Sequence, residues 1–182
     1  MTIRTKLHPL GGGNIGSTPV GQVIFNSRTV GTYTVEIPNT QNYFIDIRGG
    51  GGGGAYASVG GVVISNAGGA GGRVYGVIRL TKGTYTVSVG GAGAYVQTFQ
   101  LNGIAQGGSG GTSSISNIAS AYGGGGARCG ITFNGYYYVV AVNNAGASGS
   151  YYINEGITGL TGVVGGSGLG SQTTGYVYIE TR

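Results

Sequence analysis

The sequence predicts an all-β fold, in which a small β-sandwich or jelly-roll-like framework is combined with packed polyglycine II helices. The first observation is the scarcity of good helix formers, since the 182 residues include two Lys, three Glu, six Leu and one Met. The second is a set of short runs in which apolar and polar residues alternate, as in half-buried strands. The third is glycine, which supplies 44 residues and gathers in blocks directly behind these runs.

The same composition excludes two common classes of glycine-rich chain. Disordered chains combine low hydrophobicity with high net charge, whereas here 40% of the residues are hydrophobic and only 7% are charged. Collagen requires glycine at every third position and abundant proline, and this chain has three prolines and no such register. The composition therefore favours an ordered β protein that uses glycine for packing.

The alternating runs define the expected strands. Residues 32–37 read TYTVEI, and residues 43–48 read YFIDIR before six consecutive glycines. A similar unit recurs at 74–93, where two runs flank a short turn and the second again ends in glycine. In order, the expected strands are 22–25, 32–37, 43–48, 74–80, 85–89, 136–142 and 176–180.

The glycine blocks are expected to form left-handed polyglycine helices that pack side by side. Ordering a glycine costs roughly 0.5–1 kcal/mol more than ordering an alanine, so glycine is retained where no side chain fits. Such a helix has three residues per turn and rises ~3.1 Å per residue, so six residues span roughly 19 Å. Its N–H and C=O groups must pair with neighbouring segments. The glycines expected to pack are Gly49, Gly50, Gly51, Gly52, Gly53, Gly54, Gly90, Gly91, Gly123, Gly124, Gly125 and Gly126.

Residues 1–21 are expected to form an arm that is separate from a glycine-rich β domain at 22–182. Ile3, Leu7 and Leu10 are candidate anchor residues, because a short peptide can extend a partner's sheet while its apolar side chains fill pockets. An ordinary frayed terminus is the alternative. The segment lacks the apolar run of a secretory signal, and no stretch approaches a membrane span of ~20 residues. Synthesis in a cytosol, without membrane insertion, is expected.

Residues suited to catalysis or metal binding are few, which predicts a protein that is not an enzyme and has no cofactor or metal. His8 and Cys129 are single residues of their type, and a small buried thiol is favoured over a Cys/His pair. The carboxylates that fall in expected strands lie opposite the apolar faces, which indicates solvated positions. The nine basic residues are scattered along the chain, so no nucleic-acid partner is expected despite the net charge of +5. The four carboxylates are Glu36, Asp46, Glu155 and Glu180.

Tyrosine is the best candidate for recognition, since the chain has 14 Tyr and no Trp. Tyrosine together with Gly, Ser and Asn makes adaptable, amphipathic binding surfaces. The other interpretation is a half-buried aromatic of a small sheet, which is preferred for Tyr33, Tyr43 and Tyr85. The candidate receptor-contact residues are Tyr56, Tyr95, Tyr122, Tyr136, Tyr137, Tyr138, Tyr151 and Tyr152.

Five motifs, in order, cover about residues 31–182. They are YFIDIRGGGGGG at 43–54, KGTYTVSVGG at 82–91, GGSGGTSSI at 107–115, AYGGGG at 121–126 and GYVYIE at 175–180. Together they resemble the glycine-rich (polyglycine-helix) domain of bacteriophage tail-fibre and receptor-binding adhesin proteins, to which a region of some animal receptor kinases is related. The chain departs from this pattern at 135–160, where glycines are isolated, and the last helices are therefore expected to be shorter.

The resemblance implies a virion structural protein, a tail-fibre, fibre-tip or surface-decoration component on the tail or capsid surface that is made in the host cytoplasm. The implied partners are other virion proteins, held through the N-terminal arm, further copies of the chain such as a trimer, and a host surface glycan or outer-membrane protein. The alternative class is a host-encoded extracellular glycine-rich protein that forms filaments through its β-edges.

Overall fold

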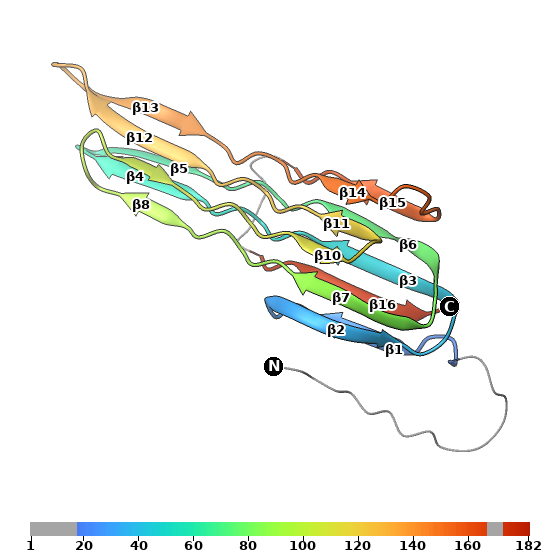
Figure 1. Cartoon of the computed structure of the whole chain (residues 1–182). Coiled ribbons are helices and arrows are strands. Elements are labelled where there is room, and N and C mark those ends of the chain that lie inside the picture. Colours follow the sequence, from blue (N-terminus) through green and yellow to red (C-terminus); the bar gives the residue numbers. More distant parts are fainter. Residues whose placement is uncertain (1–17, 167–172) are drawn as a thin grey trace.

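A computed structural model describes residues 18–166 and 173–182 and shows an elongated all-β molecule (Figure 1). No α-helix occurs among these residues, so the expected fold class is confirmed. In this part of the chain the strands are β1 (Val23–Ser27), β2 (Gly31–Ile37), β3 (Gln41–Arg48), β4 (Ala55–Val59), β5 (Val62–Asn66), β6 (Arg73–Leu80), β7 (Gly83–Val89), β8 (Val96–Thr98), β9 (Ile104–Gln106), β10 (Ser113–Ile115), β11 (Ala119–Ala121), β12 (Arg128–Phe133), β13 (Tyr138–Asn144), β14 (Tyr151–Ile153), β15 (Leu160–Val163) and β16 (Tyr176–Thr181).

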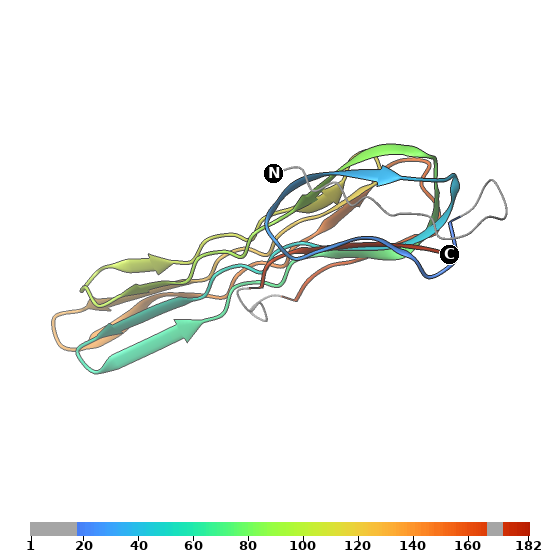
Figure 2. The same cartoon turned by 90° about the horizontal axis from the view of Figure 1, so that it is seen from below.

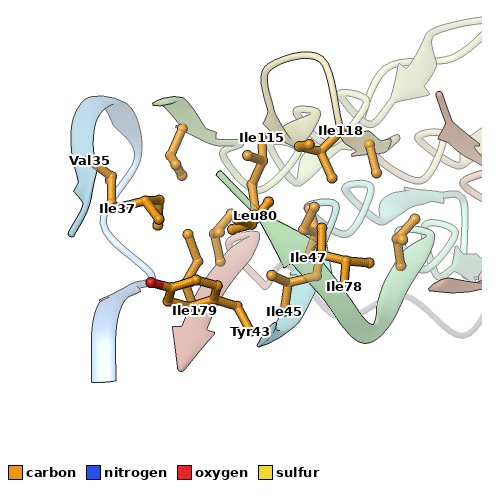
Figure 3. Packing of buried hydrophobic residues seen from close by; sticks show 14 of the residues in the cluster. Val35, Ile37, Tyr43, Ile45, Ile47, Ile78, Leu80, Ile115, Ile118 and Ile179 are labelled. Carbon is orange, nitrogen blue, oxygen red and sulfur yellow. The ribbon is translucent and has the colours of Figure 1, made fainter. Parts of the chain in front are cut away.

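One end of the molecule, which we call the large sandwich, consists of two antiparallel five-stranded sheets. Their strand orders are β1-β16-β3-β6-β15 and β14-β11-β10-β7-β2. The alternation of each strand turns its apolar residues inward, so that Tyr43, Ile45 and Ile47 of β3 are fully buried. Tyr33 and Tyr85 pack against the same core, which confirms their interpretation as sheet aromatics. Figure 3 shows core residues from both sheets, among them Val35, Ile37, Tyr43, Ile45, Ile47, Ile78, Leu80, Ile115, Ile118 and Ile179.

The opposite end, which we call the tip, is a smaller sandwich of two three-stranded sheets, β13-β12-β9 and β5-β4-β8. Within it, β4 and β8 pair in parallel. Gly60 and Gly61 join β4 to β5 with φ values of 58° and 80°, the conformation of a type I′ hairpin turn. The core of the tip is made mostly of small side chains, namely Ala55, Ala57, Ala105, Ala127, Cys129 and Ile131.

In the described part of the chain, six segments connect the large sandwich with the tip, and each is six residues long. They run side by side between the two ends in both views (Figures 1 and 2). At ~3.1 Å per residue, six residues make two turns of a polyglycine helix. Equal lengths therefore let all the strands leave one sandwich and enter the other in register. We call these six the glycine segments: 49–54, 67–72, 90–95, 107–112, 122–127 and 145–150.

Hydrogen bonding between the glycine segments repeats every third residue. The first and fourth N–H groups of segment 49–54 donate to segment 67–72, and the second and fifth donate to segment 107–112. The third donates to the carbonyl of Thr173, and all five N···O distances are 2.8–2.9 Å. No residue of the six segments has a positive φ. This three-residue repeat is that of a polyglycine II helix, whose successive N–H groups point to three different neighbours.

The number of glycines per turn follows the number of faces that meet another segment. Segment 49–54 is glycine throughout and lies inside the bundle. Segment 107–112 reads GGSGGT, and its serine and threonine are exposed. Segment 145–150 reads AGASGS, and only its two glycines are buried, where an added Cβ would lie 2.1–2.4 Å from carbonyl oxygens of segment 122–127. In these three segments, each face that touches backbone thus carries glycine at every third position.

Segment 145–150 corrects the expectation that the glycine-poor region would hold shorter helices. It has the full six residues, and it carries fewer glycines because it is an outer segment with two faces toward solvent.

The described part of the expected arm also contacts the large sandwich. The N–H of Gly21 donates to the carbonyl of Thr181 at 3.0 Å, and that of Thr18 donates to Gln41 Oε1 at 3.0 Å. The expected anchor residues Ile3, Leu7 and Leu10 lie outside the described residues.

Two glycine-to-alanine substitutions separate packing from glycine content. A Cβ at Gly52 would lie 2.0 Å from the carbonyl oxygen of Gly125, whereas a Cβ at Gly91 would meet only Val30 methyl groups at 3.6–3.9 Å. We expect Gly52→Ala to lower the free energy of unfolding by about 3 kcal/mol or more. Gly91→Ala should leave it unchanged or raise it by ~0.4–1 kcal/mol, because the unfolded chain loses freedom. Denaturant unfolding measures both, and equal losses would contradict the packing argument.

Candidate functional site

Three loops lie together at the end of the tip, opposite the C-terminus (Figure 1). They are the turn between β4 and β5, the loop 99–103 between β8 and β9, and the loop 134–137 between β12 and β13. The two longer loops contain Phe, Leu, Tyr, Asn, Gln and Gly but no charged residue. Their composition is that of an adaptable binding surface rather than of a catalytic or ionic site.

Large apolar side chains gather on this surface. Tyr136 and Tyr137 are 84% and 74% exposed, and Phe99 is 63% exposed. Scattered exposed apolar residues are normal, but a cluster at one end of a molecule indicates an interaction site. The exposed apolar residues of the tip loops and of the strands that carry them are Val63, Phe99, Leu101, Ile104, Phe133, Tyr136, Tyr137, Tyr138 and Val140.

The loop 134–137 is held by hydrogen bonds within itself. Asn134 Oδ1 accepts from the backbone N–H groups of Tyr136 (3.1 Å) and Tyr137 (2.9 Å), and Asn134 N–H donates to the carbonyl of Tyr137. Gly135 has a φ of 96°, which side-chain-bearing residues rarely adopt. These constraints turn both tyrosine side chains outward from a fixed backbone, so little backbone entropy remains to be lost when they bind.

Neighbouring aromatic residues support the loops from the sides. The ring of Tyr138 packs on Phe133 (ring centroids 5.2 Å apart) and covers Gly60 of the β4–β5 turn. Phe99 meets Tyr56 edge to face at 6.0 Å. The β8–β9 loop is tied to β12, because the N–H of Asn102 donates to the carbonyl of Ile131 at 2.9 Å. The three loops therefore form one continuous surface.

The eight tyrosines that the sequence singled out fall into two groups. Tyr56, Tyr136, Tyr137 and Tyr138 belong to the tip, and Tyr95 precedes β8 at the tip end of its glycine segment. The other three lie at the large sandwich, where Tyr151 and Tyr152 are in β14 and Tyr122 directly follows β11.

Sequence reasoning missed Phe99, Leu101, Ile104 and Phe133. The nearby Asn-Gly pairs at 102–103 and 134–135, which are typical of hairpin turns, could have found them.

Cys129 is buried in the core of the tip, where its thiol lies 3.3 Å from the carbonyl oxygen of Ala55. Burial raises the pKa of the thiol, so it stays protonated near neutral pH. Its interpretation as a small buried thiol is confirmed. His8 lies outside the described residues. Among the described residues, no group of three or more His, Cys, Asp or Glu is arranged to hold a metal ion.

Asp46 corrects the expectation of a solvated carboxylate. It lies on the outer face of β3 and is only 5% exposed. Arg48 donates to it at 2.7 Å and Arg73 at 2.8 Å. Burial by itself would raise the pKa of the Asp46 carboxyl, but the hydrogen bonds and charges of the two arginines outweigh that effect and lower it. The hydrogen bonds with Asp46 also raise the pKa of Arg73.

The lowered pKa of Asp46 predicts a pH-dependent contribution to stability. The contribution is complete above the carboxyl's ordinary pKa of ~3.9 and is lost as the pH falls through the lower value of the folded state. We expect Asp46→Asn to destabilise the protein by about 1–3 kcal/mol at pH 7, since it weakens charge-assisted hydrogen bonds in a buried site. The difference from the unsubstituted protein should shrink below about pH 4.

Glu36→Gln is the matched control, because Glu36 is exposed. It should change stability by less than about 0.5 kcal/mol at either pH. Thermal unfolding at neutral and acidic pH measures both variants. A loss in Asp46→Asn that persists in full at acidic pH would show that the ionised pair does not carry the effect.

The comparison with protein families identifies a glycine-rich domain over residues 27–180. The chain therefore belongs to the glycine-rich domain family. No curated protein matches the chain. The described strands and glycine segments fill most of the matched region. Among the described residues, no helix has the length and apolar character needed to cross a membrane.

Proposed function

We propose that the chain is a non-enzymatic structural protein of a virion, a phage tail-fibre, fibre-tip or surface-decoration component whose tip contacts a receptor on the host surface. The observation that carries this proposal is the aromatic tip: Tyr136 and Tyr137 project from a hydrogen-bonded turn at one extremity of an elongated molecule. Family membership establishes the glycine-rich domain alone, so the proposal rests on the geometry of the tip.

The division of the molecule suits such a role. The large sandwich holds the bigger hydrophobic core, and the bundle of glycine segments sets the tip apart from it. The tip loops offer aromatic rings and amide groups without charge. Aromatic faces stack on sugar rings, and amides hydrogen-bond to hydroxyl groups or to protein backbone, so a surface glycan or an outer-membrane protein loop is the kind of receptor we propose.

The virion assignment is tested by locating the protein. An antibody raised against the purified chain is applied to particles and cells from a culture that produces it, and gold labelling is examined by electron microscopy. We expect label on the fibres or surface of tailed particles. Label on extracellular filaments attached to the producing cells would contradict the assignment and support a host-encoded filament protein that assembles through its sheet edges.

The tip is tested by substituting its two most exposed tyrosines. The fluorescently labelled chain is titrated onto intact cells of the strain that the labelled particles infect. We expect Tyr136→Ser/Tyr137→Ser to weaken binding by at least about tenfold, because exposed aromatic anchors dominate such interfaces. Its melting temperature should be unchanged, since both side chains are exposed.

Tyr122→Ser/Tyr152→Ser is the matched control, because these tyrosines are also exposed but lie at the large sandwich. It should bind as the unsubstituted protein does. Equal losses in both double variants, or an undiminished affinity in the tip variant, would contradict receptor binding through the tip.

The proposed attachment to other virion proteins through residues 2–16, which lie outside the described residues, is tested by deletion. The truncated chain should keep the melting temperature of the full chain, because the described core residues of both sandwiches all lie at position 24 or beyond. It should be absent from purified particles. Normal incorporation of the truncated chain would place the attachment elsewhere.

A further inference from the structure

Three of the nine basic residues, scattered in the sequence, meet on the outer face of the large sandwich. Arg28 follows β1, Arg48 ends β3, Arg73 begins β6, and Tyr176 begins β16. These four strands are adjacent in the order β1-β16-β3-β6. Tyr176 is paired with Arg48, and Arg48 is paired with Arg73. Arg28 directly follows Ser27 of β1, and Ser27 pairs with Val177, the neighbour of Tyr176. The register therefore places all four in one row.

The row faces away from the hydrophobic core. The strand neighbours Ile47, Val74 and Val177 are core residues, and successive residues of a strand point to opposite faces. The row also lies where the strands join the glycine segments, since Arg48 and Arg73 flank segments 49–54 and 67–72.

The row lines a hollow of about 320 Å³, which we call the arginine hollow. This volume falls at the lower end of the ~300–1,000 Å³ of small-ligand sites. The guanidinium carbons of Arg28 and Arg48 lie 4.8 Å and 5.7 Å from the centroid of the Tyr176 ring, which orients both groups. The rest of the lining is Gly49, Ala70, Gly71, Gly72, Thr173 and Thr174.

The charges in the hollow are not balanced. Asp46 is the one carboxylate that the described structure gives as a partner of these arginines, so three positive charges and one negative charge leave an excess of two. The residues outside the description, 1–17 and 167–172, contain no Asp or Glu that could supply another. Like charges on directly paired strand positions are destabilising. Asp46 binds both Arg48 and Arg73 and offsets one of their two charges. With Arg28 beside them, the row keeps an excess of positive charge, which favours a bound anion.

We propose that the arginine hollow binds an acidic monosaccharide unit through its carboxylate or phosphate group. Guanidinium groups pair with both oxyanions through parallel N–H···O hydrogen bonds. The Nε and Nη2 groups of Arg48 and Arg73 already donate to Asp46, so Arg28 supplies the parallel pair and the other two arginines supply their remaining Nη hydrogens. The volume exceeds what a single oxyanion needs, and the threonine hydroxyls and glycine backbone of the lining suit the hydroxyl groups of a sugar ring. The site lies on the large sandwich, so it stands independently of receptor binding at the tip.

Nuclear magnetic resonance of the full-length ¹⁵N-labelled chain tests the proposal through the arginine Nε–H signals. The probes are glucuronate, glucose 6-phosphate and, as the uncharged control, glucose, all at constant ionic strength. We expect the signals of Arg28, Arg48 and Arg73 to shift and saturate with at least one anionic sugar and to stay in place with glucose. The stronger of the two anions identifies the carboxylate or the phosphate as the preferred group.

Arg28→Gln removes one charge of the hollow without touching the pairs of Asp46, so we expect it to weaken binding about tenfold, equivalent to about 1.4 kcal/mol. Arg28→Lys keeps the charge but loses the planar fork, so its affinity should lie between those of the unsubstituted chain and Arg28→Gln. Arg79→Gln is the matched control, an exposed arginine of β6 outside the hollow, and should bind normally. The proposal is overturned if neither anion moves the three signals, if glucose moves them equally, or if Arg79→Gln weakens binding as much as Arg28→Gln.

Discussion

The structure depends on one steric constraint, the approach of backbone to backbone without an intervening Cβ. Within the bundle, a Cβ added at Gly50 or Gly53 would lie 2.0 Å or 1.8 Å from a carbonyl oxygen of a neighbouring segment. No side-chain rearrangement relieves a contact with backbone, so glycine is required at these positions. The close approach in turn allows lateral hydrogen bonds of 2.8–2.9 Å to satisfy peptide groups that a polyglycine helix leaves unpaired. Packing and hydrogen bonding therefore depend on the same absence of side chains.

Both sandwiches follow from this arrangement. Six segments of equal length deliver strands to the tip in a fixed register, so a core made mostly of alanines is sufficient to close the tip sheets. The large sandwich carries the larger core, which is rich in isoleucine and valine. The tip loops can then be composed of exposed aromatic and amide residues because they contribute little to the core beneath them.

Much of the fold could be predicted from local sequence. Alternating runs such as TYTVEI and YFIDIR became β2 and β3, and glycine blocks behind strands became packed segments. The strands β4, β5, β8 to β12, β14 and β15 were missed, and five of them have only three residues, too few to show a period. In GGSGGT and AGASGS, the number of glycines in each triplet reflects how many faces of the segment meet another segment. This relation can be recognised only once the arrangement of the bundle is known.

The candidate sites were less predictable, since they depend on distant pairing. Tyr136 and Tyr137 could be singled out by composition, whereas their grouping with Phe99 required the loops of two different sheets to meet. Asp46 was expected to be solvated because nothing near it in sequence shows Arg73 across the β3–β6 pair. Likewise, nothing local indicates that Arg28 and Arg48 lie on either side of β16.

The parallel course of the glycine segments has a mechanical consequence. A pull applied between the tip and the large sandwich runs along all six covalent backbones at once, so each carries a fraction of the load. The lateral hydrogen bonds lie across this direction, and sliding one segment past its neighbours would require several of them to break together rather than in succession. A bundle made of the most flexible residue is therefore stiff along its axis, and it transmits tension from one end of the molecule to the other with little extension.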